Sequence, residues 1–354
     1  MIFSPHMHIG IIGNGKMGHG IFQYLSEFEF QLSIVCEEEE QADALKATFQ
    51  KKTARLLKNG IITAEQAEHR LRAISINSDL SILSTADLII EAIPEVIDLK
   101  RKLFSRIEKI AKPSCIFTSN TSSIPPSELF SGIRNKENCA GLHFFYPVSL
   151  KDLAEINASP STSAETIQFL NSLLNYTGKF HLKLAEPDTF IINKIFLGIQ
   201  SEACTILNEG LISAEEIDAL ADEYIFPGGI FLFFDHVGID IMYASVGNYT
   251  AKLSERENFL DILNRLKLLA GNGMLGVKSG KGFYDHSNGT ISIRKRELLS
   301  TSVYVSCLAR LKTAFYQSLH AIIRKGICSK EQLDFIIKEY TGAEKGPFEN
   351  SIQN

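Results

Sequence analysis

His-Ile-Gly-Ile-Ile-Gly-Asn-Gly-Lys-Met-Gly-His-Gly, at residues 8–20, is a short apolar run that breaks into glycines. Gly13, Gly15 and Gly18 have the G-x-G-x-x-G spacing, which is typical of a buried parallel strand, a tight turn and the first turn of a helix. Gly15 would let the backbone approach a pyrophosphate, and the start of the helix would offer it free N–H groups. The predicted phosphate-binding segment also includes Asn14, Lys16 and Met17.

A second strand-like run, from Gln31 to Cys36, follows at the expected distance and leads into Glu37. An acid at this point accepts hydrogen bonds from the ribose hydroxyls of NAD and repels the 2′-phosphate of NADP. The alternative is that Glu37 merely starts a solvated acidic run, residues 37–40. Together with the glycine motif, the pattern predicts NAD as the cofactor.

The composition is that of an ordinary globular protein of 354 residues, with 45% apolar residues, 22% charged residues and a net charge of −5. This charge gives no reason to expect nucleic acid or an anionic membrane as a partner. No apolar run is long enough for a membrane-spanning helix, and no Cys/His cluster indicates a metal. Six scattered cysteines without C-x-x-C spacing, and no visible secretory signal, favour reduced thiols and a cytoplasmic location.

Strand-like runs alternate with helical patterns through the first half of the chain. The runs are 73–76, 87–93, 114–119 and 139–145, and a helix is expected over 96–112 with apolar positions 96, 99, 103, 107 and 110. The alternation predicts an α/β fold with a Rossmann-type, doubly wound and mostly parallel sheet. Ligands bind beyond the carboxyl ends of such strands, so Glu95, the turn at 119–123 and His143 are the polar groups of interest.

Residues 41–72 predict a helical pair inserted into this fold, with a break at Asn59-Gly60 and a capping box from Thr63 to Gln66. The first helix would present a basic face made of Lys51, Lys52, Arg55 and Lys58. From the pattern alone, an ordinary solvated face is an equally good interpretation.

Past Asp188 the alternation stops, and 190–208, 213–224 and 260–269 have helical patterns, so an all-α C-terminal domain is expected. It contains a degenerate internal repeat, because residues 208–218 resemble residues 324–334 and Gly229-Ile-Phe resembles Gly346-Pro-Phe. We therefore predict a nucleotide-binding domain at 1–186, a helical domain at 187–297 and a partial second repeat at 298–354.

Six motifs in order make the chain similar to the L-3-hydroxyacyl-CoA dehydrogenases of fatty-acid β-oxidation, with the last segment similar to the second helical repeat of the multifunctional members. They are Gly-Asn-Gly-Lys-Met-Gly-His-Gly-Ile (13–21), Glu-Ala-Ile-Pro-Glu (91–95), Ser-Asn-Thr-Ser-Ser (119–123), Gly-Leu-His-Phe-Phe-Tyr-Pro-Val (141–148), Phe-Ile-Ile-Asn-Lys (190–194) and Gly-Val-Lys-Ser-Gly-Lys-Gly-Phe-Tyr (276–284). The resemblance implies NAD-dependent, reversible oxidation of L-3-hydroxyacyl-CoA to 3-oxoacyl-CoA.

The resemblance also assigns roles to individual residues. The family's catalytic His–Glu pair falls on His143 and Glu155, and a histidine suits the removal of a hydroxyl proton because it titrates near neutral pH. A histidine that is merely part of the core is the alternative for His143. The substrate-polarising positions fall on Ser122 and Asn193. Family contacts with the nicotinamide dinucleotide fall on Glu95, Lys100, Ser122 and Lys278, for which ordinary surface charge is the alternative where the side chain is charged. Contacts with CoA fall on Thr53, Lys58 and Ser122.

Three departures from the family pattern bear on substrate preference: Tyr146 replaces an Asn, Asp188-Thr189 replaces Pro-Gly, and Gly229-Ile-Phe-Leu replaces Gly-Pro-Phe-Glu. Two other functions stay open, a β-hydroxyacid dehydrogenase that acts on a non-CoA substrate and a degenerate NAD- or acyl-CoA-binding relative without catalysis. The chain could also be the dehydrogenase part of a complex with other β-oxidation enzymes. The resemblance implies an acyl-CoA substrate and a monomer or a homodimer, the second repeat covering the surface through which stand-alone members pair.

Overall fold

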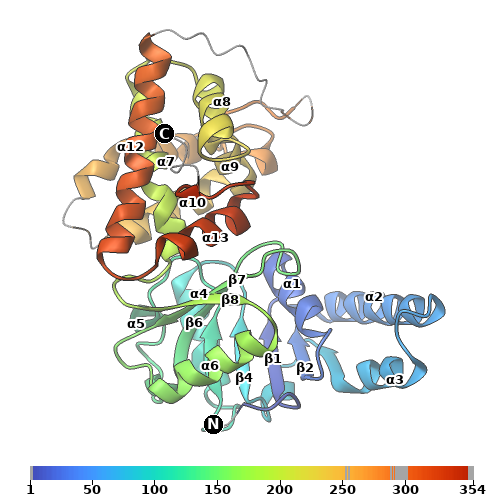
Figure 1. The fold of residues 1–354 in the computed structure, drawn as a ribbon. Helices are drawn as coiled ribbons and strands as arrows, with labels where there is room; N and C mark the ends of the chain where they lie inside the picture. Colours follow the sequence, from blue (N-terminus) through green and yellow to red (C-terminus); the bar gives the residue numbers. More distant parts are fainter. Residues whose placement is uncertain are drawn as a thin grey trace. The chain divides into compact units, whose positions relative to one another are not determined.

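The structure, a computed structural model, describes residues 3–349 apart from 252, 254, 255, 288, 290 and 292–301. The chain forms two compact units, Met1–Thr189 and Phe190–Asn354. The first is built on a sheet, and the second consists of helices, as predicted (Figure 1). The expected boundary between residues 297 and 298 lies outside the described residues.

The sheet of the first unit has eight strands among the described residues, in the order β3-β2-β1-β4-β5-β6-β7-β8. The strands are β1 (His8–Ile12), β2 (Gln31–Val35), β3 (Ile74–Asn77), β4 (Leu88–Glu91), β5 (Ile116–Ser119), β6 (Cys139–Phe144), β7 (Leu153–Ala158) and β8 (Phe180–Ala185). Within this described sheet, β6 and β7 pair antiparallel, and the other neighbouring strands pair parallel. The predicted doubly wound sheet is confirmed, and the strand order reverses beside β1, where ligands bind in such sheets.

Helices cover both faces of this sheet. They are α1 (Lys16–Leu25), α2 (Glu39–Lys58), α3 (Ala64–Ala73), α4 (Ile97–Ile107), α5 (Pro126–Leu129) and α6 (Ala164–Tyr176), with short 3₁₀ turns η1 (Leu80–Leu83) and η2 (Lys136–Asn138). Successive strand residues point to opposite faces. Ile11 therefore packs in one apolar core with α1, α2 and α6, whereas Ile12 packs in a second core with α4 and α5. The predicted helical pair is α2 and α3, and the capping box at Thr63 is present.

The helix predicted at 96–112 is shorter than expected, and only the later apolar positions of the predicted face, 103, 107 and 110, pack against the core. Val96 and Leu99 are 53% and 45% exposed, whereas Phe104 and Ile107 are buried together with a charged residue, Lys100. The apolar spacing is misleading here because Lys100 finds acceptors below the helix that the sequence pattern does not reveal.

The second unit contains helices α7 (Ile191–Asn208), α8 (Ala214–Tyr224), α9 (Ile230–Val237), α10 (Ile239–Thr250), α11 (Leu260–Gly271), α12 (Ser302–Arg324) and α13 (Lys330–Thr341), with 3₁₀ turns η3 (Arg256–Phe259) and η4 (Val277–Ser279). Within the described residues, no single helix has the length and apolar composition of a membrane span; only α9 and α10 taken together do, and they meet at a bend of 104°.

The two copies of the internal repeat share the same capping box and the same aspartate contact. Both α8 and α13 begin with a capping box. From α8, the Asp218 carboxylate accepts a hydrogen bond from the Phe231 N–H (2.8 Å), and from α13 the Asp334 carboxylate accepts one from the Phe348 N–H (2.8 Å). Each aspartate thereby fixes the turn that follows its helix, which explains why both copies keep an aspartate and a Gly-x-Phe segment.

The second repeat packs on the first. Phe196 of α7 stacks on Phe315 of α12 with ring centroids 6.0 Å apart. Arg310 of α12 pairs with Glu202 (2.5 Å) of α7 and with Glu209 (2.6 Å) just beyond it. Helix α12 therefore covers a face of α7 within the same chain.

Candidate active site

The loop between β1 and α1 turns tightly at its glycines. Gly13 has a φ of 105°, and a Cβ there would lie 2.7 Å from the Ala92 carbonyl oxygen. A Cβ on Gly18 would overlap the Gly13 carbonyl oxygen, so α1 packs against the loop only because this residue is glycine. At Gly15 a Cβ would meet nothing within 4 Å, and the outer side of the loop is open.

These residues fit a dinucleotide. Helix α1 starts after Gly15 with no capping side chain and no acid in its first turn, so its first N–H groups suit a phosphate. Asn14 Oδ1 is buried without a hydrogen-bond partner, as expected of an atom that a ligand satisfies. Lys16 is exposed, and Met17 is partly buried. NAD therefore fits the loop, and these residues would hold its phosphates.

Glu37 is exposed just past the carboxyl end of β2, which is the sheet neighbour of β1. The glycine loop leaves the same edge of the sheet, because β1 and β2 are parallel. The position agrees with the predicted ribose contact, which stays a prediction.

The carboxyl ends of the next strands bring further polar side chains together. Glu91 ends β4, and Ser119, its partner in the strand register, ends β5. The Ser119 hydroxyl donates to Glu91 Oε2 (2.5 Å), and Asn120 Oδ1 accepts from the Phe144 N–H (2.8 Å) at the end of β6. The turn after β5 is therefore tied to the strands on both sides of it.

His143 and Glu155 form a buried pair on neighbouring antiparallel strands. They are direct register partners of β6 and β7, so both side chains point to the same face of the sheet. His143 Nδ1 lies 2.9 Å from Glu155 Oε2, and the two side chains are 7% and 0% exposed. The spacing of twelve residues is the span of a hairpin, and the pair meets the geometric requirement for an oriented base.

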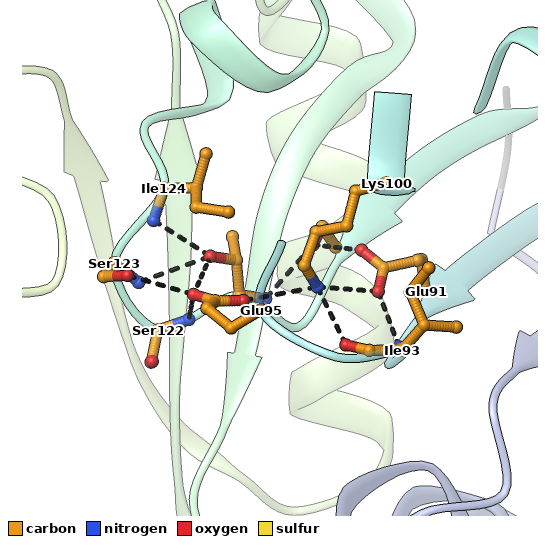
Figure 2. Close-up of polar contacts among 9 residues, drawn as sticks. Glu91, Ile93, Glu95, Lys100, Ser122, Ser123 and Ile124 are labelled. Carbon is orange, nitrogen blue, oxygen red and sulfur yellow. Dashed lines mark hydrogen bonds and ion pairs between the residues drawn. The ribbon is translucent and has the colours of Figure 1, made fainter. Parts of the chain in front are cut away.

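Glu95, in the segment between β4 and α4, organises the turn at 119–124 (Figure 2). Its Oε1 atom accepts from the Thr121 hydroxyl (2.5 Å), the Ser122 N–H (3.1 Å) and the Ser123 hydroxyl (3.0 Å). Thr121 Oγ1 in turn accepts from the Ile124 N–H (2.9 Å). Figure 2 shows the Ser122 hydroxyl pointing away from this carboxylate.

Lys100 lies between Glu91 and Glu95 (Figure 2) and is not a surface charge. Its side chain is 1% exposed, and its Nζ atom lies 2.7 Å from Glu91 Oε1 and 3.3 Å from Glu95 Oε2. The Ile93 carbonyl accepts a third bond from it at 3.2 Å.

The residues predicted to contact CoA differ in their exposure to solvent. The basic side chains of α2, including Lys58 at its last position, are exposed as expected. Thr53 does not share this face: it is 1% exposed, and its hydroxyl is buried without a partner. Burial and then the charge of Lys52 lower the pKa of His19 in α1.

Two predicted site residues belong to the second unit. Asn193, in the first turn of α7, donates from Nδ2 to the Tyr249 hydroxyl at 2.9 Å. Lys278 is 45% exposed and pairs with Asp240 at 2.5 Å. Each is described within its own unit, and their roles toward a ligand stay predictions.

Glu91, Ser119 and Asn120 support the site, but the sequence predicts no individual role for them: Ser119 and Asn120 are of interest only as part of the turn at 119–123. The sequence does indicate that Glu91 has a partner, because an acid inside an apolar strand is costly to bury unless a cation pairs with it. That cation is Lys100, nine residues later in the helix that follows β4.

Comparison with known proteins places both units. Residues 8–186 match the family model described as 3-hydroxyacyl-CoA dehydrogenase, NAD binding domain, and residues 190–286 match that of the C-terminal domain of the same family. The chain is 33% identical over 281 residues to the 3-hydroxyadipyl-CoA dehydrogenase of Escherichia coli (strain K12), covering 78% of this chain and 58% of that protein. It is 32% identical over 289 residues to the mitochondrial hydroxyacyl-coenzyme A dehydrogenase of Sus scrofa, covering 79% and 91%.

The fold is shared beyond the matched sequence. A crystal structure of 3-hydroxybutyryl-CoA dehydrogenase from Escherichia coli superimposes with a TM-score of 0.77, at 21% identity, over 98% of this chain and 91% of that one. At this identity the likeness concerns the fold alone. The two family models, which together match more than half of the chain, identify it as a member of the 3-hydroxyacyl-CoA dehydrogenase family.

Proposed function

We propose that the protein catalyses the reversible, NAD-dependent oxidation of L-3-hydroxyacyl-CoA to 3-oxoacyl-CoA, with His143 and Glu155 as its base and orienting acid. The observation that carries the proposal is the buried pair at 2.9 Å, on the sheet whose first loop fits a dinucleotide. When bound, NAD supplies the acceptor for the hydride that leaves C3.

His143 would take the hydroxyl proton. With the proton of the neutral imidazole on Nδ1, where Glu155 accepts it, Nε2 carries the lone pair and serves as the base. The imidazolium that forms is stabilised by the carboxylate, which does not itself need to take the proton. The C3 oxygen then becomes a carbonyl as its proton passes to Nε2.

Ser122 would hold the oxygen of the substrate. The turn that carries it is fixed by the bond that Ser119 donates to Glu91, by the bond that Asn120 accepts from the Phe144 N–H and by the Glu95 carboxylate, so its hydroxyl is placed before the substrate arrives. A donor that needs no reorganisation stabilises charge that develops on the reacting oxygen. Asn193 is proposed as a second donor from the helical unit.

The basic side chains of α2 would attract the phosphates of CoA. Lys58 and its neighbours Lys51, Lys52 and Arg55 are exposed on one helix, and phosphate groups bind strongly to such cations. A free 3-hydroxy acid carries one carboxylate and no phosphate, so several cations on one helix favour a CoA thioester over a substrate without CoA.

The test is the absorbance of NADH when pure protein is mixed with NAD and a series of L-3-hydroxyacyl-CoA thioesters. His143→Ala is expected to lower kcat by about 10²–10⁴-fold, the usual contribution of a general base. The matched control is His320→Ala, on the exposed side of α12. Oxidation of free 3-hydroxy acids at the same rate as their CoA thioesters would refute the substrate assignment, and an active His143→Ala would refute the mechanism.

We also propose that the chain is a monomer or a weak dimer, because α12 covers a face of α7 through Phe315 and Arg310. Sedimentation velocity of the full chain at micromolar concentration should give the mass of a monomer. A dimer that persists at nanomolar concentration would contradict this.

A further inference from the structure

The ammonium of Lys100 is enclosed by acceptors of the protein itself. A lysine ammonium carries three N–H donors. Three acceptors surround this one, namely Glu91 Oε1 at 2.7 Å, the Ile93 carbonyl at 3.2 Å and Glu95 Oε2 at 3.3 Å. The side chain is also 1% exposed, so a cofactor could reach its Nζ only if this cluster came apart.

We propose that Lys100 is a positioning residue: it holds Glu95 in place, Glu95 fixes the turn at 119–124, and the turn orients Ser122. The inference deepens the proposed function and rests on it, because Ser122 is the donor that we place on the substrate oxygen. It departs from the direct cofactor contact that the family resemblance implies for Lys100.

The contacts run continuously from Lys100 to Ser122 (Figure 2). Glu95 turns one oxygen to the ammonium and the other to three donors of the turn, including the Ser122 N–H at 3.1 Å. On the other side, Glu91 accepts from the Ser119 hydroxyl at 2.5 Å, at the start of the same turn. One ammonium thus holds two carboxylates, and each carboxylate holds one end of the turn.

The charge of Lys100 is what keeps this arrangement together. Without it, two carboxylates would lie close together, Glu91 fully buried and Glu95 with 21% of its side chain exposed, and their like charges would repel each other with no cation between them. The turn would then lose its fixed geometry, and Ser122 would lose its place.

The first experiment measures the turn itself, by amide hydrogen exchange of the full chain followed by mass spectrometry. Lys100→Met should speed exchange of the peptide that covers 119–124 by about 10-fold or more, because local opening sets the exchange rate, while leaving residues 8–20 unchanged. Lys100→Arg should restore most of the protection, since it keeps the charge. Lys102→Met, an exposed lysine of the same helix, is the matched control.

A second variant guards against loss of the fold. Lys100→Met leaves Glu91 buried without a cation, so Lys100→Met/Glu91→Gln is measured beside it. The pair removes equal and opposite charges and still deprives Glu95 of its ammonium. Faster exchange of the turn in the double variant supports the proposal, and wild-type exchange in a folded double variant overturns it.

The second experiment separates positioning from cofactor binding. Lys100→Met should lower kcat about 10–100-fold, the scale of a displaced reacting group, and change the Kd for NADH, followed by fluorescence, by less than about 3-fold. Lys100→Met/Glu95→Gln should be no worse than Lys100→Met alone, because both act through one path. A Kd raised tenfold with kcat intact would mean that Lys100 binds the cofactor directly and would overturn the proposal.

The experiments distinguish a failure of the proposed function from a failure of the positioning role of Lys100. If the wild-type protein oxidises no 3-hydroxyacyl-CoA, the proposed function fails, and the exchange experiment still decides whether Lys100 holds the turn. If the wild type is active and the Lys100 variants match Lys102→Met in both experiments, only the positioning role fails.

Discussion

Among the residues that the structure describes, two buried histidine–carboxylate pairs have nearly the same geometry, one in each unit. His143 lies 2.9 Å from Glu155, and His286 lies 2.8 Å from Asp235. The histidine side chains are 7% and 6% exposed, and both carboxylates are 0% exposed. Distance and burial alone therefore do not distinguish a candidate base from a structural contact.

The surroundings distinguish them. The Asp235 carboxylate also accepts the Phe283 and Tyr284 N–H groups, each at 2.9 Å, and a Cβ on Gly282 would overlap it. It is the centre around which the segment at 276–284 folds, which gives that sequence motif a structural reason. His143 instead lies at the end of β6, beside a turn fixed at the carboxyl edge of the sheet. A pair is a better catalytic candidate when it sits at such an edge than when it closes a loop.

Exchanging the acid for its amide should separate the two pairs most strongly. Glu155→Gln is expected to lower kcat by about 10²–10⁴-fold, since an amide cannot stabilise the imidazolium and favours the wrong tautomer. Asp235→Asn should leave kcat within about 3-fold but lower the free energy of unfolding by about 2–4 kcal/mol, because buried N–H groups lose charged acceptors.

The measurements are kcat with an L-3-hydroxyacyl-CoA and urea unfolding of each variant. If Asp235→Asn loses as much activity as Glu155→Gln while remaining equally stable, the distinction between the two pairs is wrong.

Much of the sheet unit could be predicted because its signals are local. The glycine loop, the alternation of strands and helices and the capping box at Thr63 each depend on residues close together in sequence. The order of the strands up to β6 follows from the parallel fold. Strands β7 and β8 were not predicted. In β7, Glu155 and Asn157 are buried among apolar residues, so the sequence shows no clean alternation of polar and apolar residues.

The candidate site was predictable only in part, because contacts between residues far apart in the sequence bring its side chains together across the sheet. The roles of His143 and Glu155 came from the resemblance, and what unites the pair in space is the register of β6 and β7. Lys100 was expected to touch cofactor from a surface helix, yet it is buried between Glu91 and Glu95. A helical pattern reports which positions share a face but not that a buried lysine finds two carboxylates there.

Tyr284→Phe is the mildest test of the comparison, because Tyr284 joins the Asp235 pair to Asp218 of the first repeat. The Tyr284 N–H binds Asp235, and its hydroxyl donates to Asp218 Oδ2 at 2.7 Å. Burial raises the pKa of Asp218 to about 6, and the bonds it accepts act against that rise. The loss of the hydroxyl should therefore raise the pKa of Asp218 further.

The sign of the pH effect follows from proton linkage. Between the unfolded pKa near 4 and the folded pKa near 6, the folded chain binds more protons at Asp218, so this group's contribution to stability falls as pH rises through that window. Because the Tyr284→Phe substitution would extend the window upward, the variant should lose little stability at pH 5 and about 1–2 kcal/mol at pH 8, with kcat unchanged. Urea unfolding at both pH values measures this. Equal destabilisation at pH 5 and pH 8 would mean that the hydroxyl does not act through the charge of Asp218. Lost activity in a stable variant would mean that the carboxylates of the helical unit do more than stabilise its fold.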